Sequence, residues 1–166
     1  MITIVSGTNR PGSNTQKVAK AYFQLLKDVH VDCKLLSLET YTVHTRNVYF
    51  EHMEKEFLIP AQKFIFVFPE YHGSFPGILK LMIDNSDVPK CYHNKKVLLT
   101  GVSSGRAGNL RGMEHLTGSF MHMKMIVHPN RLPISLVDKL QHTNDVLTDE
   151  NTLILIKDQV QAFLTF

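Results

Sequence analysis

The sequence predicts a doubly wound α/β fold, in which five parallel strands alternate with helices that cover both faces of the sheet. Short apolar runs rich in β-branched residues recur along the chain, and segments with helical periodicity follow them. Three of the predicted strands lead into loops rich in glycine, serine, asparagine or proline. Because crossovers between parallel strands are right-handed, we expect these loops at one edge of the sheet, where ligands of such folds bind.

The first part of the chain contains two predicted strands and two predicted helices. Ile2 to Ser6 is a short apolar run typical of a buried strand, and Val31 to Leu38 suits a second strand. Between them, Thr15 to Val29 repeats apolar residues every three or four positions, which predicts an amphipathic helix. The pattern from Thr40 to Gln62 is weak and predicts only a short helix, from four apolar residues: Tyr49, Phe50, Met53 and Phe57.

The middle of the chain contains the most strongly apolar segment. Lys63 to Phe68 is a continuous apolar run stopped by Pro69, which predicts a central strand buried on both faces. Phe75 to Asp87 follows as a predicted helix, with Ser74 at its N-cap and Pro76 in its first turn.

The remaining elements continue the alternation. Lys95 to Ser103 predicts a fourth strand, and Ala107 to Phe120 predicts the helix after it. Met123 to Val127 predicts a fifth strand that ends near Pro129. A last helix is expected at about Glu150 to Leu164, where apolar residues share one side.

The composition is that of an ordinary globular chain and predicts one domain spanning residues 1–166. The net charge of +3 comes from scattered basic residues, which disfavours nucleic-acid binding. No apolar run approaches the ~18 residues of a membrane span, and the first residues do not resemble a signal peptide. Two cysteines are too few for a disulfide framework, and the histidines lack metal-ligand spacing. We therefore expect a cytoplasmic protein with no metal site.

The first loop, Gly7 to Thr15, has the features of a phosphate site. A predicted helix begins directly after it, and helix amino ends attract anions through unpaired N–H groups and the helix dipole. Arg10 adds a guanidinium suited to phosphate oxygens. Helix capping explains one polar residue here but not the several that the loop contains. The loop matches neither the Walker motif nor the G-x-G-x-x-G dinucleotide motif.

The second loop, Pro69 to Gly77, is rich in turn-forming residues but also carries Tyr71 and Phe75. Such aromatic side chains are able to flank a flat ligand. Taken alone, however, the loop is better explained by an ordinary strand-to-helix turn with an aromatic side chain in the core.

The third loop, Ser103 to Asn109, allows two interpretations. Its glycines permit close approach of the backbone to a ligand. The segment Gly101 to Gly105 also matches the G-x-S-x-G nucleophile elbow, which makes a serine hydrolase the rival hypothesis. Ser103 would then be the nucleophile, followed along the chain by Asp138 and His142. Against that hypothesis, the chain is short for the hydrolase fold and has no His-Gly-Gly oxyanion loop.

Together the three loops give the sequence a family resemblance. It resembles the NADPH-dependent FMN reductase family of the flavodoxin-like fold, which includes azo, quinone and chromate reductases. The family loop Gly-Ser-x-Arg-x-x-Ser corresponds here to Gly-Thr-Asn-Arg-Pro-Gly-Ser from Gly7. The family segment Pro-Glu-Tyr-Asn-Gly-Ser, with its Pro-Gly-x-Leu-Lys helix, corresponds to Pro69 to Lys80. The resemblance spans about residues 1 to 128 and implies the strand order 2-1-3-4-5.

The resemblance implies an FMN site built from the three loops. Five residues match positions that bind the FMN phosphate: Thr8, Arg10, Ser13, Asn14 and Thr15. Six match the loop that lines the isoalloxazine ring: Pro69, Glu70, Tyr71, His72, Gly73 and Ser74. Three match the loop on the other side of the ring: Ser103, Ser104 and Gly105. NADPH or NADH would give a hydride to the flavin, so the resemblance implies no catalytic side chain.

The implied function is an FMN-dependent NAD(P)H oxidoreductase. It would pass electrons to a small-molecule acceptor such as a quinone, an azo compound, a metal oxyanion or a free flavin, and the family suggests a homodimer or tetramer. The alternative is an FMN-binding electron carrier or sensor, although a pI near 8.9 contrasts with acidic flavodoxin carriers. One departure from the family concerns the flavin directly: His72 stands where the family has Asn, and a protonated imidazole there would favour the reduced, anionic flavin.

Overall fold

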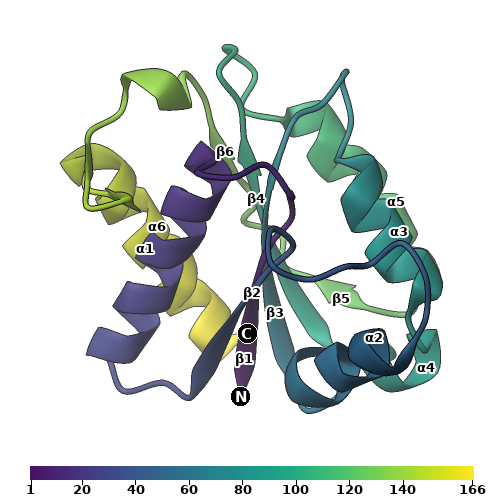
Figure 1. The fold of residues 1–166 in the computed structure, drawn as a ribbon. Coiled ribbons are helices and arrows are strands. Elements are labelled where there is room, and N and C mark those ends of the chain that lie inside the picture. The colour runs from purple at the N-terminus through teal and green to yellow at the C-terminus, as the bar shows by residue number, and fades with distance from the viewer.

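A parallel β-sheet runs through the centre of the protein, and the computed structural model describes it over all residues 1–166 (Figure 1). The strand order is β2-β1-β3-β4-β5, which confirms the predicted order. The strands on this path are β1 (Ile2–Ser6), β2 (Cys33–Ser37), β3 (Lys63–Pro69), β4 (Lys96–Val102) and β5 (Ile126–Val127). The carboxyl ends of β1, β3 and β4, and the loops that follow them, lie at the upper edge of the sheet in Figure 1.

Helices cover both faces of this sheet (Figure 1). One face carries α1 (Asn14–Asp28) and α6 (Glu150–Thr165). The other face carries α2 (Val48–Met53), a π-helical turn η1 (Glu54–Leu58), α3 (Gly77–Asn85), α4 (Val88–Cys91) and α5 (Leu110–His122). The predicted short helix near Phe50 is thus confirmed. It continues directly into the π-helical turn, which ends before β3.

Strand β3 is buried on both faces, as its uninterrupted apolar sequence predicts. Its aromatic side chains Phe64, Phe66 and Phe68 belong to the core under α2 to α5. The alternate residues Ile65 and Val67 belong to the core under α1 and α6. All five side chains are fully buried, and burial of each stabilises the fold by roughly 1.5–3 kcal/mol.

The fifth position of the sheet is split, so the predicted strand from Met123 to Val127 is wrong in its extent. Only Ile126–Val127 forms β5, beside the amino half of β4. A further strand, β6 (Leu132–Ile134), pairs in parallel with the carboxyl half of β4. Pro129 lies between the two and lacks the N–H that a continuous strand would need. The amide of Gln159 on α6 fills the gap by donating to the carbonyl of Asn130.

Three short elements between β6 and α6 were not predicted. They are the 3-10 turn η2 (Val137–Lys139) and the hairpin of β7 (His142–Thr143) with β8 (Val146–Leu147). Asn144 and Asp145 both have positive φ, as a two-residue hairpin turn requires. An Asn-Asp pair between short strands is therefore a signal from which this hairpin could have been predicted.

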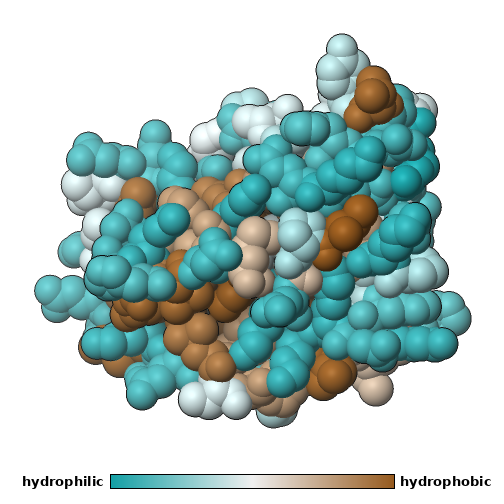
Figure 2. All heavy atoms as spheres, turned by 90° about the horizontal axis from the view of Figure 1, so that it is seen from below, coloured by the Kyte–Doolittle hydropathy of each residue, from teal (hydrophilic) through white to brown (hydrophobic).

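The surface seen from the amino ends of the strands is mostly hydrophilic (Figure 2). Apolar side chains gather there on the side of α1 and α6. No helix in the structure combines the length and the apolar character that crossing a membrane requires.

A buried carboxylate fastens the segment before α2 to the start of α4. Glu54 is only 1% exposed. Its Oε1 accepts a 2.7 Å hydrogen bond from Nη1 of Arg46, and its Oε2 forms a 2.7 Å ion pair with Nη2 of the same guanidinium. Glu54 also accepts a 2.7 Å hydrogen bond from the backbone N–H of Asp87. The thiol of Cys91 lies 3.6 Å from the same carboxylate, and burial raises the pKa of this thiol to about 12. Cys91 is therefore an inert structural residue.

We expect Arg46→Met to lower the free energy of unfolding by about 3 kcal/mol, because it leaves the buried Glu54 carboxylate without its countercharge. The double variant Arg46→Met/Glu54→Met should recover most of this loss, since it removes both charges and keeps apolar volume. Urea unfolding of the two variants and the unaltered chain measures both effects. A loss below about 1 kcal/mol in the single variant would show that the pair is energetically unimportant.

Candidate functional site

Three loops meet at the carboxyl edge of the sheet and enclose a cavity of about 540 Å³. They follow β1, β3 and β4, which are neighbours in the sheet, so the cavity runs along adjacent strand ends. Ten of the predicted site residues line it: Arg10, Ser13, Asn14, Thr15, Pro69, Glu70, Tyr71, His72, Ser103 and Ser104. The remaining lining residues are Pro11, Val102, Val137 and Asp138.

The first loop presents the amino end of α1 to the cavity. Ser13 is the N-cap, and its hydroxyl accepts a 3.1 Å hydrogen bond from the backbone N–H of Gln16. The backbone N–H groups of Asn14 and Thr15 donate to no other group of the chain. The first turn also carries no acidic side chain. Free N–H groups at the positive end of a helix dipole suit an anion.

Tyr71 joins the first loop to the second. Its hydroxyl lies 2.7 Å from the Thr8 hydroxyl, which is buried. The Arg10 guanidinium stacks over the Tyr71 ring, 4.2 Å from the ring centroid. Thr8 therefore does not line the cavity itself but fixes the aromatic residue that does. The stacked Arg10 is the only lysine or arginine among the residues that line the cavity.

The second loop contains a two-residue turn that the sequence analysis did not identify. Tyr71 and Ser74 exchange backbone hydrogen bonds of 2.9 and 3.2 Å. Between them, His72 and Gly73 have φ values of 53° and 76°. Positive φ at both central residues favours Asn-Gly, which gives a backbone reason for the Asn that the family resemblance places at this position. Histidine also tolerates this conformation, so His72 is compatible with the turn.

The prediction that Ser74 caps the following helix is wrong. The N-cap of α3 is Pro76, and the Ser74 hydroxyl lies 2.9 Å from Nδ1 of His115 on α5. The side chain of Arg111, also on α5, lies against Gly73, where an added Cβ would come within 3.0 Å of its Nη1 atom. Gly73 and Ser74 thus connect the turn to α5 behind it instead of lining the cavity.

The third loop folds closely over the end of β4. The Cα of Gly101 packs against the carbonyl oxygen of Gly108, and a Cβ at Gly108 would lie 2.6 Å from Cβ of Pro133. The buried Asn109 donates from Nδ2 to the carbonyl of Phe68, at 3.0 Å, which ties this loop to the end of β3. Close packing therefore accounts for Gly101 without a nucleophile elbow.

The structure does not form the Ser-His-Asp chain that the serine-hydrolase hypothesis requires. The Ser103 hydroxyl accepts a 2.9 Å hydrogen bond from the N–H of Gly105, an ordinary turn interaction. Asp138 is hydrogen-bonded to Asn14, and both ring nitrogens of His142 lack a partner. The hydrolase reading is therefore set aside. Ser103 remains a lining residue, and Gly105 acts through its backbone.

The sequence analysis missed one wall of the cavity, formed by the η2 turn. Val137 and Asp138 reach the cavity from a segment that follows β6. Asp138 had been considered only as part of the hydrolase hypothesis. Its Oδ1 accepts a 2.6 Å hydrogen bond from Nδ2 of Asn14, although the two residues are 124 positions apart. No local pattern signals a contact between residues so far apart.

Sequence comparison identifies the family. Residues 1–137 match the model of the family described as NADPH-dependent FMN reductase. A curated NAD(P)H-dependent FMN reductase of Pseudomonas aeruginosa is 31% identical over 113 residues. That alignment covers 65% of this chain and 60% of the relative, so the match spans less than two thirds of the relative's length.

Structural comparison agrees with the fold. FerB of Paracoccus denitrificans, a flavoenzyme NAD(P)H:(acceptor) oxidoreductase, superposes with a TM-score of 0.83 at 19% identity, over 99% of this chain and 94% of FerB. The apo form of the NADH:FMN oxidoreductase EMOB superposes with a TM-score of 0.75 at 15% identity, over 99% of this chain and 89% of EMOB. With most of its length matched by the family model and its parallel sheet in the order 2-1-3-4-5, the chain belongs to the NADPH-dependent FMN reductase family.

Proposed function

We propose that the chain binds FMN in the cavity and passes electrons from NADPH or NADH to a small-molecule acceptor. The acceptor would be a quinone, an azo compound, a metal oxyanion or a free flavin. The observation that carries the proposal is the cavity itself, which joins the free amino end of α1 to the loops after β3 and β4. Family membership and the named activities of the relatives support the same reading.

The amino end of α1 fits a phosphate group. Ser13, Asn14 and Thr15 offer backbone N–H groups and short polar side chains, and Arg10 offers a positive charge. Thr8 contributes by holding Tyr71 in place. We assign the FMN phosphate to this end of the cavity.

The other two loops fit the isoalloxazine ring. Pro69, Glu70, Tyr71 and His72 border the cavity after β3, while Gly73 and Ser74 hold their turn against α5. Ser103 and Ser104 border it after β4, and Gly105 fixes the Ser103 hydroxyl. We assign the ring to the space between these two loops.

The chemistry in this proposal belongs to the cofactor, since bound FMN accepts a hydride and releases electrons one or two at a time. The residues of the chain bind and orient it. No side chain is assigned as an acid or base, because hydride transfer between a nicotinamide and a flavin requires none. Neither cysteine, nor any Ser-His pair, is placed to act as a nucleophile on a ligand in the cavity. Within this proposal residues 1–166 form one FMN-binding domain that works in the cytoplasm, as a dimer or tetramer.

The purified chain should take up one FMN and show flavin absorbance near 450 nm. Anaerobic addition of NADPH or NADH should then bleach that absorbance, and adding a quinone should restore it. A chain that binds no added FMN would refute the proposal. A chain that binds FMN which neither nicotinamide reduces would instead be an electron carrier or sensor.

Arg10→Ala should weaken FMN binding by about tenfold to a hundredfold, because a charge-assisted hydrogen bond to phosphate contributes about 1.5–3 kcal/mol. The affinity for riboflavin, which lacks the phosphate, should fall much less. Flavin fluorescence titrations measure both. Arg106→Ala is the matched control, since Arg106 is an exposed arginine at the same edge of the sheet but does not line the cavity. Equal losses of FMN and riboflavin in Arg10→Ala would indicate a role in stacking on Tyr71 alone.

His72→Asn should lower the midpoint potential of the bound flavin at pH 6, by about 30 mV or roughly 1.4 kcal/mol for two electrons. The substitution removes a group that carries positive charge when protonated, while Asn preserves the positive φ of the turn. A spectroscopic redox titration at pH 6 and again at pH 8.5 measures the effect. The difference should shrink at the higher pH, where imidazole loses its charge. An unchanged potential at pH 6 would contradict this role of His72.

A further inference from the structure

A carboxylate stands at the end of the cavity where the proposed function places a phosphate. Asp138 lines the cavity together with Asn14, and its Oδ1 accepts the 2.6 Å hydrogen bond from the Asn14 amide. Asn14 is the first residue of α1, whose amino end attracts anions. A carboxylate of the chain itself is therefore held beside that amino end by the Asn14 side chain, while the backbone N–H groups of Asn14 and Thr15 remain free.

The position of Asp138 is fixed by the third loop. The N–H of Leu136 donates to the carbonyl of Gly105, and the N–H of Val137 donates to the carbonyl of Ser103, both at 3.1 Å. Leu136 has a φ of 50°, an uncommon value for leucine, and the side chain of Val137 is buried. The η2 turn is therefore held on two sides, by the third loop and by Asn14. A non-glycine residue in a rare backbone conformation is often found where surrounding structure imposes a functional geometry.

The charges that line the cavity do not favour a dianion strongly. Arg10 is the only lysine or arginine there, whereas Glu70 and Asp138 both contribute a carboxylate. Like charges at close range repel one another, and the repulsion is stronger when the ligand excludes water. A phosphate that approaches Asn14 has to displace the Asp138 carboxylate and then remain near it.

We propose that Asp138 is a specificity-determining residue that competes with the flavin phosphate for the side-chain amide of Asn14 and repels an anion at the amino end of α1. This inference rests on the proposed FMN site. Its consequence is that the chain discriminates weakly between phosphorylated and unphosphorylated flavin. The carboxylate lowers the affinity for FMN and leaves that for riboflavin unchanged, so the flavin exchanges readily with free flavin.

The test compares two flavins on the full chain freed of bound flavin. Asp138→Asn keeps the size of the side chain and removes its charge, so the dissociation constant for FMN should fall at least tenfold. The constant for riboflavin should stay within about twofold. Asp138→Ser removes the charge without adding an amide donor and should also tighten FMN selectively. Fluorescence quenching titrations give all the constants, and circular dichroism verifies that each variant is folded.

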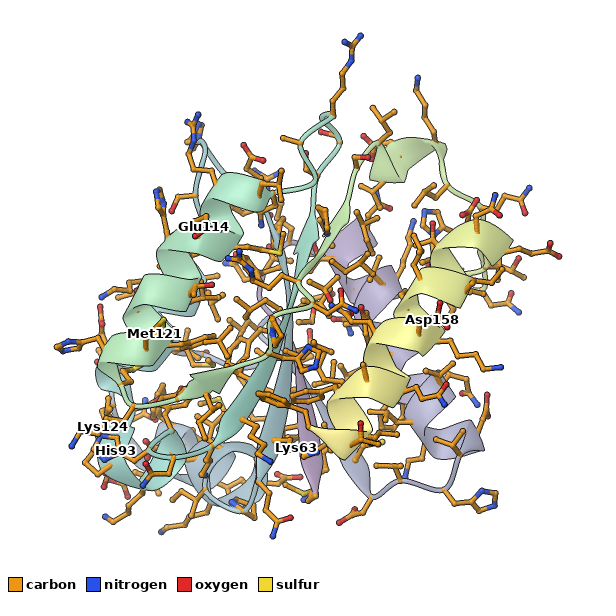
Figure 3. The ribbon with its side chains drawn as sticks, turned by 180° about the vertical axis from the view of Figure 1, so that it is seen from behind. Lys63, His93, Glu114, Met121, Lys124 and Asp158 are labelled. Atoms are coloured by element: carbon orange, nitrogen blue, oxygen red, sulfur yellow. The ribbon has the colours of Figure 1, made fainter.

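A matched control separates the local effect from the change in net charge. Asp158 is exposed in the middle of α6, below the edge of the sheet that carries the cavity (Figure 3). Asp158→Asn alters the net charge by the same amount and should change neither constant by more than about twofold. An equal gain in FMN affinity from Asp158→Asn would overturn the inference, because the effect would then come from the overall charge.

Three further outcomes also decide the matter. An unchanged FMN constant in folded Asp138→Asn and Asp138→Ser would show that the carboxylate does not compete with the phosphate. Weaker binding of both flavins would show that Asp138 accepts a hydrogen bond from a part they share, and would overturn the inference while leaving the FMN site intact. If the unaltered chain binds neither flavin, the proposed function fails, and the inference fails with it.

Discussion

The burial of β3 on both faces is the constraint on which the rest of the structure depends. Alternate side chains of this one strand belong to two different cores, with aromatic residues on one face and branched aliphatic residues on the other. A slip of one residue would exchange the two sets between cores that are packed for different shapes. The register of β3 therefore determines how β1 and β4 pair with it on either side. It also determines where the three loops leave the sheet, and so where the cavity lies.

The parts of the fold that the sequence predicted well are those with a local cause. The apolar run of β3, the helical period of α1 and the glycine that ends β1 each depend on residues close in the chain. The break in the fifth position has a local cause in Pro129, but the connection to β6 also depends on a contact between distant elements, since Gln159 of α6 satisfies the carbonyl of Asn130. The exposed Glu114 of α5 adds a 2.7 Å ion pair with Arg131 in the same connection (Figure 3). Hydrophobic periodicity contains no information about such long-range polar contacts.

The candidate site also combines parts that have a local cause in the sequence with a part that depends on long-range contacts. Three walls follow strands with recognisable loop motifs, so their residues could be predicted from the sequence together with the family resemblance. The fourth wall, Val137 and Asp138, has no motif of its own and is placed by hydrogen bonds of residues 136–138 to Ser103, Gly105 and Asn14. Thr8 and Ser74 show a related limit. Both are predicted as site residues, but neither lines the cavity. The Thr8 hydroxyl contacts the Tyr71 hydroxyl, and the Ser74 hydroxyl contacts His115. Only the three-dimensional arrangement separates such supporting residues from those that line the cavity.

The turn at His72 and Gly73 constrains the backbone of position 72 but not its side chain. The backbone demands positive φ at both residues, and α5 fixes the turn from behind through its contacts with Gly73 and Ser74. Asparagine and histidine both satisfy the demand of the backbone, because both tolerate this conformation better than most residues do. The side chain at position 72, however, faces the cavity and meets no such constraint. An exchange of Asn for His therefore alters the charge and hydrogen bonding offered to a ligand without rebuilding the loop, so the electrostatics of the site can vary while its geometry stays the same.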